Sequence, residues 1–281
     1  MDTITEPVAS DDTLHTAASS SVATVVAIAC VVYASAIALH ELAHALTGLA
    51  VGGQPTLISS TDVRGNWENV GQLGFMALGM SGSAVNWLLA VLGIIWIQRA
   101  RPRSSARFFP WLLLAVNGFI PSVYMVASPL LGFGDWMTIL SRFQHQLILR
   151  VFIAIVGINV AFAWFALVSR WLTRIVAGVP EGRRIPLARR LTLTSWLTGG
   201  VLAVAAALLS PLGLPRALLI AAGSTLGTTF LILPAARLAE SARRRVAPTI
   251  WDGVGPGLVW TPVGTLLAAV FIFFLGRGIQ L

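Results

Sequence analysis

Two histidines and a glutamate stand together near the end of the first apolar segment, in the sequence His40-Glu41-Leu42-Ala43-His44. On a helix, positions i and i+4 lie on one face, so both imidazoles of this H-E-x-x-H motif can bind one Zn²⁺. Glu41 lies beside that face, where it can accept a proton from water that the ion activates. Such groups are costly in an apolar helix unless they have partners. We therefore predict a zinc site with Glu41 as the catalytic base, rather than a structural hydrogen-bond cluster.

A catalytic zinc site needs three protein ligands and an open position for water, so a third ligand must be found. Three carboxylates are candidates. Asp135 follows the third apolar segment and should emerge on the same membrane face as His44. Glu68 lies 24 residues after His44, which is compatible with the Glu ligand of thermolysin-type zincins, and Asp62 lies in the same loop. We favour Asp135 because a carboxylate next to an apolar span has the greatest need of a cation.

The composition is that of a membrane protein. Of the 281 residues, 56% are hydrophobic and 11% are charged, whereas soluble domains carry about 25% charged residues. This excludes a soluble globular enzyme and a disordered chain. The only cysteine, Cys30, lies inside the first apolar segment, which excludes a disulfide scaffold and a cysteine-rich metal site.

The apolar residues form segments long enough to cross a bilayer, so we predict an all-α polytopic membrane protein with about seven transmembrane helices. The predicted spans are 22–49, 72–98, 108–131, 148–169, 191–212, 216–236 and 258–276. The polar insertion 51–71 contains Gly, Thr, Ser and Val and suggests a short β-hairpin at the membrane surface. Residues 1–21 read as a mobile acidic tail.

Every basic residue is an arginine, and the arginines indicate the orientation. Fourteen arginines lie in three loops that share one face of the membrane, 99–107, 170–190 and 237–245. Five arginines lie on the opposite face. The positive-inside rule then places the N-terminus in the cytoplasm of a multi-pass protein of the cell membrane. We expect the lipid bilayer as a partner and no nucleic acid, because no soluble domain presents a basic face.

Three motifs, in order, resemble the site-2 protease family of intramembrane zinc metalloproteases. The first is the HExxH motif in a hydrophobic helix. The second is Gly82-Ser-Ala-Val-Asn86, which is similar to the family's G-x-x-x-N element. The third is Asn117-Gly-Phe-Ile-Pro121 followed by Gly134-Asp135-Trp136, which is similar to its N-x-x-P…D-G element.

The resemblance covers about residues 22–140 and implies a three-helix zinc metalloprotease core, with 141–281 as an additional four-helix region. It implies that His40, His44 and Asp135 hold Zn²⁺ and that Asn86 and Asn117 bind substrate.

This sequence departs from the family pattern. The family's Asn-to-Pro gap is one residue shorter, its Asn-to-Asp distance is much shorter than the 18 positions here, and Trp136 stands where Gly is usual.

The expected function is hydrolysis of peptide bonds in a membrane-protein substrate, within or next to the membrane. The alternative is a non-enzymatic scaffold or regulator with a structural or degenerate zinc site. A transporter is the weaker hypothesis, because the last four spans carry no ionisable residue in their interiors and no pair of broken helices.

Overall fold

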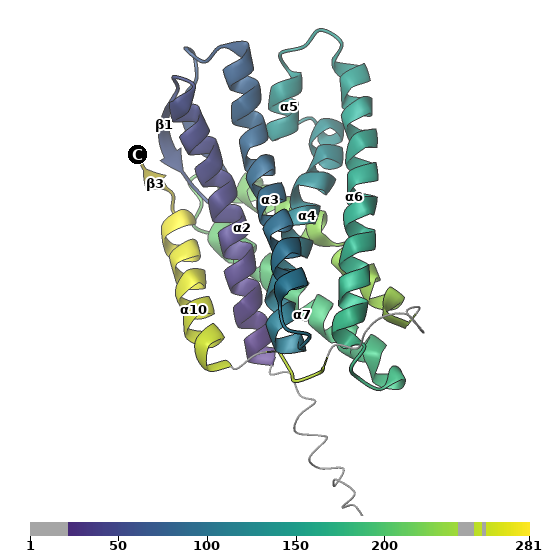
Figure 1. Ribbon diagram of the computed structural model, residues 1–281. Helices are drawn as coiled ribbons and strands as arrows, with labels where there is room; N and C mark the ends of the chain where they lie inside the picture. The colour runs from purple at the N-terminus through teal and green to yellow at the C-terminus, as the bar shows by residue number, and fades with distance from the viewer. Residues whose placement is uncertain (1–21, 241–249, 255–256) are drawn as a thin grey trace, which may run out of the picture.

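The computed structural model describes residues 22–240, 250–254 and 257–281. Within these ranges seven helical segments are long and apolar enough to cross a membrane, which confirms the predicted all-α polytopic fold (Figure 1). The predicted acidic tail, 1–21, lies outside the described residues. The spans are α2 (Val22–Ala50), α3 (Gln72–Arg99), α4 (Ser104–Leu131), α6 (Gln146–Val176), α7 (Glu181–Ala207), the segment Leu214–Leu238 and the segment Gly257–Leu275.

The sixth span is not one regular helix. It consists of α8 (Leu214–Ala222), the π-helix η1 (Gly223–Gly227), the single turn α9 (Ile232–Ala235) and the 3₁₀-helix η2 (Ala236–Glu240). The seventh span, α10 (Gly257–Val270), also ends in a π-helix, η3 (Phe271–Leu275). Such π-helical turns are rare and often lie at functional sites.

The arginine-rich stretch 170–190 differs from the predicted loop. Helices α6 and α7 extend through most of it and leave only residues 177–180 between them. Arginine is a good helix former, and its long side chain reaches water from a helix end. The arginines therefore lie on the helix ends, where they are still outside the apolar part of the spans.

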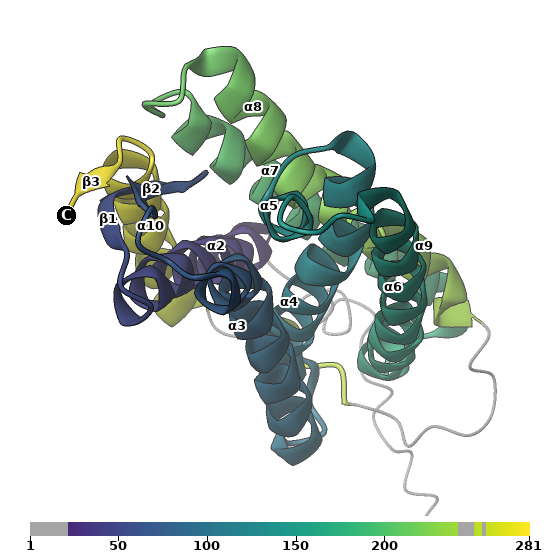
Figure 2. The ribbon, with the colours of Figure 1, turned by 90° about the horizontal axis from the view of Figure 1, so that it is seen from above.

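Helix α4 lies at the centre of the bundle, packed against α3 and α6, as the view from above shows (Figure 2). Several of its apolar side chains, among them Trp111, Leu112 and Phe119, are fully buried. By contrast α3 and α6 expose leucine, isoleucine and phenylalanine side chains on their outer faces. In a bilayer this apolar outer surface faces lipid, where such exposure is favourable.

The 51–71 insertion forms the predicted hairpin, made of β1 (Gln54–Ile58) and β2 (Val63–Asn66). A third strand, β3 (Ile279–Gln280), pairs antiparallel with the other edge of β1, so the strand order is β2-β1-β3. Trp67 holds the hairpin on α2, because its ring lies against Gly48 and Gly53, where a Cβ would clash. Because β2 and β3 lie on opposite sides of β1, the strand β1 is paired along both of its edges.

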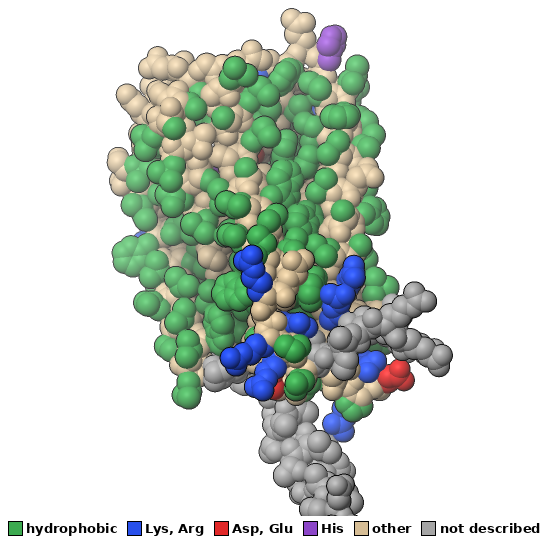
Figure 3. All heavy atoms as spheres, in the orientation of Figure 1, with side chains coloured by type: hydrophobic (Ala, Val, Ile, Leu, Met, Phe, Trp, Pro, Cys, Tyr) green, Lys and Arg blue, Asp and Glu red, His purple; other side chains and the backbone are tan. Residues whose placement is uncertain are grey.

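The two ends of the bundle differ in charge. Arginine side chains gather at the lower end, where α2 begins (Figure 3). Helices α2 and α4 run upward from that end and α3 runs back down between them, so the hairpin and the short helix α5 (Asp135–Leu140) lie at the opposite end (Figure 1). This agrees with the predicted placement of the segment after α4 beside the end of α2.

Candidate metal centre

His40, His44 and Asp135 meet in a nearly equilateral triangle of ligand atoms. The Nε2 atoms of the two histidines are 3.1 Å apart, and each lies 3.3 Å from Asp135 Oδ2. The histidines come from consecutive turns of α2, and the aspartate is the first residue of α5. These three residues could hold a metal ion.

The triangle has the dimensions of a tetrahedral zinc site. With Zn–N and Zn–O bonds of about 2.0–2.2 Å, tetrahedral geometry separates neighbouring ligand atoms by about 3.3 Å. The distances of 3.1, 3.3 and 3.3 Å fit this value. Three protein ligands also leave a fourth position for water, as in catalytic zinc sites.

Hydrogen bonds donated by Nδ1 of His40 and His44 turn the Nε2 lone pairs of both rings toward Asp135. His44 Nδ1 donates to the Leu78 carbonyl oxygen at 2.7 Å, and a carbonyl can only accept. Asn86 donates from Nδ2 to the carbonyl of Ala36 and to Asn117 Oδ1, so its Oδ1 faces His40 and accepts from Nδ1 at 2.6 Å. A neutral histidine with a proton on Nδ1 has a bare Nε2. Three acceptor atoms therefore converge, an arrangement that a cation stabilises.

Asp135 is partly buried, at 24% side-chain exposure, and lies outside the spans. Burial alone would raise its pKa, but when no metal is bound and His44 and His40 are protonated, their charges and hydrogen bonds bring the pKa well below its ordinary value. The carboxylate is thus held in the ionised form that a metal requires.

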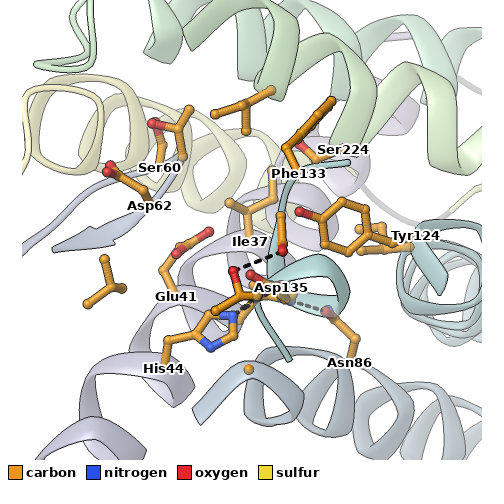
Figure 4. Close-up of a pocket in the computed structure, with 18 of the residues that line it drawn as sticks. Ile37, Glu41, His44, Ser60, Asp62, Asn86, Tyr124, Phe133, Asp135 and Ser224 are labelled. Carbon is orange, nitrogen blue, oxygen red and sulfur yellow. Dashed lines mark hydrogen bonds and ion pairs between the residues drawn. The ribbon is translucent and has the colours of Figure 1, made fainter. Parts of the chain in front are cut away.

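Glu41 lines the same cavity as the triad of His40, His44 and Asp135, but Glu41 does not belong to that triad. Its side chain is buried, and Figure 4 shows it near His44 and Asp135. Asp62 also lines the cavity, where its carboxylate pairs with Arg64 Nε at 3.0 Å and accepts a hydrogen bond from Ser59. Glu68, the other candidate ligand, is exposed and does not line the cavity.

The two asparagines of the predicted site differ in position. Asn86 lines the cavity and contacts His40, whereas Asn117 is fully buried behind it and donates to the Leu113 carbonyl. Through Asn86, Asn117 supports the orientation of His40. Substrate binding by either residue stays a prediction.

The cavity around the triad has a volume of about 570 Å³ and is mostly apolar. Ile37, Leu78, Ile120 and Phe133 contribute apolar walls. The wall opposite the triad comes from the sixth span, to which the sequence pattern assigns no role. That wall includes Arg216, Leu219, Ile220, Ser224 and Thr228.

The apolar pattern of the sixth span did not indicate its contribution to the cavity, because its apolar residues resemble those of any lipid-facing helix. Arg216 at its start and the Gly223–Gly227 stretch, which forms the π-helix η1, were the available hints.

Replacing Asn86 with Ala is expected to weaken zinc binding by about 10–100-fold, because outer partners that orient a ligand histidine have effects of this size. The substitution removes the acceptor of His40 Nδ1 and leaves Asn117 Oδ1 without its donor. Zinc affinity can be measured by competition with a chromophoric chelator. Asn159→Ala is the matched control, since the hydrogen bond that its amide makes among the described residues goes to the Ile155 carbonyl of the same helix, α6. Unchanged affinity in Asn86→Ala would show that Asn86 does not orient His40 for the metal.

Comparison of the chain with protein families, with curated proteins and with solved structures gives no significant match.

Proposed function

We propose that this protein is an intramembrane zinc metalloprotease that hydrolyses peptide bonds of membrane-protein substrates. The observation that carries the proposal is the triangle of His40, His44 and Asp135, with Glu41 beside it in one cavity. A two-histidine, one-carboxylate set also suits non-haem iron. Zinc is favoured because Glu41, next to the first ligand, is placed for hydrolytic proton transfer.

A zinc ion held by these three residues would supply Lewis-acid activation of water and of the peptide carbonyl. Glu41 accepts the proton of the attacking water and then delivers it to the nitrogen of the leaving amine. The apolar walls of the cavity limit access of bulk water and strengthen the electrostatic interactions inside. Asn86 keeps His40 in the orientation that the centre needs.

A transmembrane substrate must unwind before cleavage, because its peptide groups are hydrogen-bonded within the helix. The hairpin offers an edge for the extended segment. In the order β2-β1-β3 the free edges among the described strands belong to β2 and β3, and of these two strands only β2 contributes a residue to the cavity wall. Val63, the first residue of β2, lines the cavity. A substrate strand added to β2 would therefore lie beside the metal centre.

We further propose that the protein lies in the cell membrane with its N-terminus in the cytoplasm, on the basis of the fourteen arginines on one face and five on the other. Because the triad lies toward the end opposite the arginines, its cavity would then be reached from the outer side.

Asp135→Ala should lose both zinc and proteolysis, whereas Glu68→Ala should keep both, because only Asp135 belongs to the triad. The assay uses detergent-purified protein, metal analysis that separates zinc from iron, and fluorescein-labelled casein as the peptide probe. We expect about one zinc per chain, and cleavage that 1,10-phenanthroline stops and added zinc restores.

Cleavage that persists after the metal is removed would overturn the metalloprotease proposal. Zinc bound without cleavage of casein or of any membrane-protein probe would favour the scaffold or regulator. Loss of zinc in Glu68→Ala but not in Asp135→Ala would move the third ligand to the hairpin.

A further inference from the structure

Tyr124, on α4, lies beside the backbone that carries the third ligand. It lines the cavity, and its hydroxyl group is directed toward the segment of Gly134 and Asp135 (Figure 4). Gly134 has φ +86°, and a Cβ at this position would clash with the Tyr124 hydroxyl oxygen. The absence of a side chain at Gly134 therefore gives the phenol its place next to Asp135.

The phenol ring is held by packing on its other side. It contacts a small apolar cluster built around Met125, Trp136 and Ile139. The hydroxyl oxygen lies against the backbone at Gly134, next to Asp135. Among the hydrogen bonds of the described residues, none uses the Tyr124 O–H as donor. The Tyr124 O–H group is thus a donor that remains available at the cavity. It lies beside Gly134, the residue before Asp135.

The asparagine and histidine donors next to the triad are already used. The Nδ2 group of Asn86 donates to Asn117 and to the Ala36 carbonyl, and its Oδ1 accepts from His40. The two ligand histidines use Nδ1 to donate to Asn86 and to the Leu78 carbonyl. Asn86 therefore has no hydrogen left for a substrate in this arrangement.

Hydrolysis of a peptide bond places negative charge on the carbonyl oxygen, and a fixed donor at that oxygen lowers the barrier. We propose that Tyr124 donates a hydrogen bond to the carbonyl oxygen of the scissile peptide and stabilises its negative charge in the transition state. This inference rests on the proposed hydrolytic function. It assigns the contact with the developing negative charge to Tyr124, whereas the family resemblance implies that Asn86 and Asn117 bind substrate.

The test compares Tyr124→Phe with Tyr33→Phe. These are the only two tyrosines of the chain, and Tyr33 is buried away from the cavity with its hydroxyl bonded to Thr229 at 3.0 Å. For zinc-loaded Tyr124→Phe we expect unchanged zinc content and a kcat on casein that falls by about 10²–10³-fold. KM should change far less than kcat, and Tyr33→Phe should behave as the wild type.

A second readout is independent of turnover. A phosphoryl dipeptide presents a tetrahedral anion, and isothermal titration calorimetry on the zinc-loaded protein measures its affinity. Tyr124→Phe should bind this probe at least about tenfold more weakly, in line with the loss of a hydrogen bond to a charged group. Tyr33→Phe should bind it as the wild type does.

The outcomes separate this inference from the function on which it rests. Loss of zinc in Tyr124→Phe would make the role structural and overturn the proposal, as would an unchanged kcat. Ser60, whose buried Oγ is unpartnered at the cavity, is the rival donor. A loss in Ser60→Ala with none in Tyr124→Phe would assign the contact to Ser60. If the wild type holds zinc but cleaves nothing, the function fails. In that case the affinities of the wild type and Tyr124→Phe for the phosphoryl dipeptide test the inference. Equal affinities, or no binding by the wild type, would overturn the role of Tyr124.

Discussion

Replacing Glu41 with Gln is expected to abolish proteolysis while zinc stays bound. Gln has nearly the same shape but cannot accept the proton of the attacking water, and a positioned general base typically contributes about 10²–10⁴-fold to the rate. Zinc should remain because Glu41 is outside the triad of His40, His44 and Asp135. The measurements are zinc content and single-turnover cleavage of labelled casein.

The matched control is Glu68→Gln, which makes the same chemical change at an exposed position outside the cavity. It should leave both zinc content and cleavage unchanged. Normal turnover by Glu41→Gln would contradict the mechanism. Loss of zinc together with activity would instead place Glu41 among the ligands.

Replacing Gly82 with Ala should remove the metal without unfolding the helix that carries it. An added Cβ would lie 2.5 Å from Nε2 of His40, the atom that faces the other two ligands. The ring must then swing away or α3 must shift, and either movement breaks the triangle. We expect zinc affinity to fall by more than the roughly 10–100-fold cost of losing an outer partner.

The same change improves the helix itself, since Ala is favoured over Gly by about 1 kcal/mol in a helix interior. Circular dichroism should therefore show full helicity while metal analysis shows a loss. Gly71→Ala, at the start of the same helix, is the control, because its added methyl group would meet no atom within 4 Å beyond its chain neighbours. Full zinc occupancy in Gly82→Ala would show that His40 is not held where the triangle requires.

Sequence reasoning predicts the parts of this protein that repeat with a simple period. Apolar segments of about 20 residues identify the spans because the bilayer demands that length. The i, i+4 spacing of His40 and His44 identifies the shared face of α2. The placement of Asp135 near His44 follows from counting spans, because two segments separated by one antiparallel helix run in the same direction.

Contacts made by the backbone are not predictable in this way. The Leu78 carbonyl that orients His44 could belong to any residue type, so nothing in the sequence distinguishes it. Strand β3 pairs with β1 through main-chain groups, and its two residues carry no strand pattern. The contribution of the sixth span to the cavity depends on how distant helices pack together, which apolar periodicity does not specify.

The pairing of Leu57 with Gln280 has a consequence for the order of events during synthesis. Translation proceeds at about 5–20 residues per second, so roughly ten to forty-five seconds separate the appearance of these two partners. During that interval the outer edge of β1 is open, while the other strand of the hairpin is already made. In a nascent chain, His40, His44 and Asp135 can therefore come together before β3 is added to the sheet beside them.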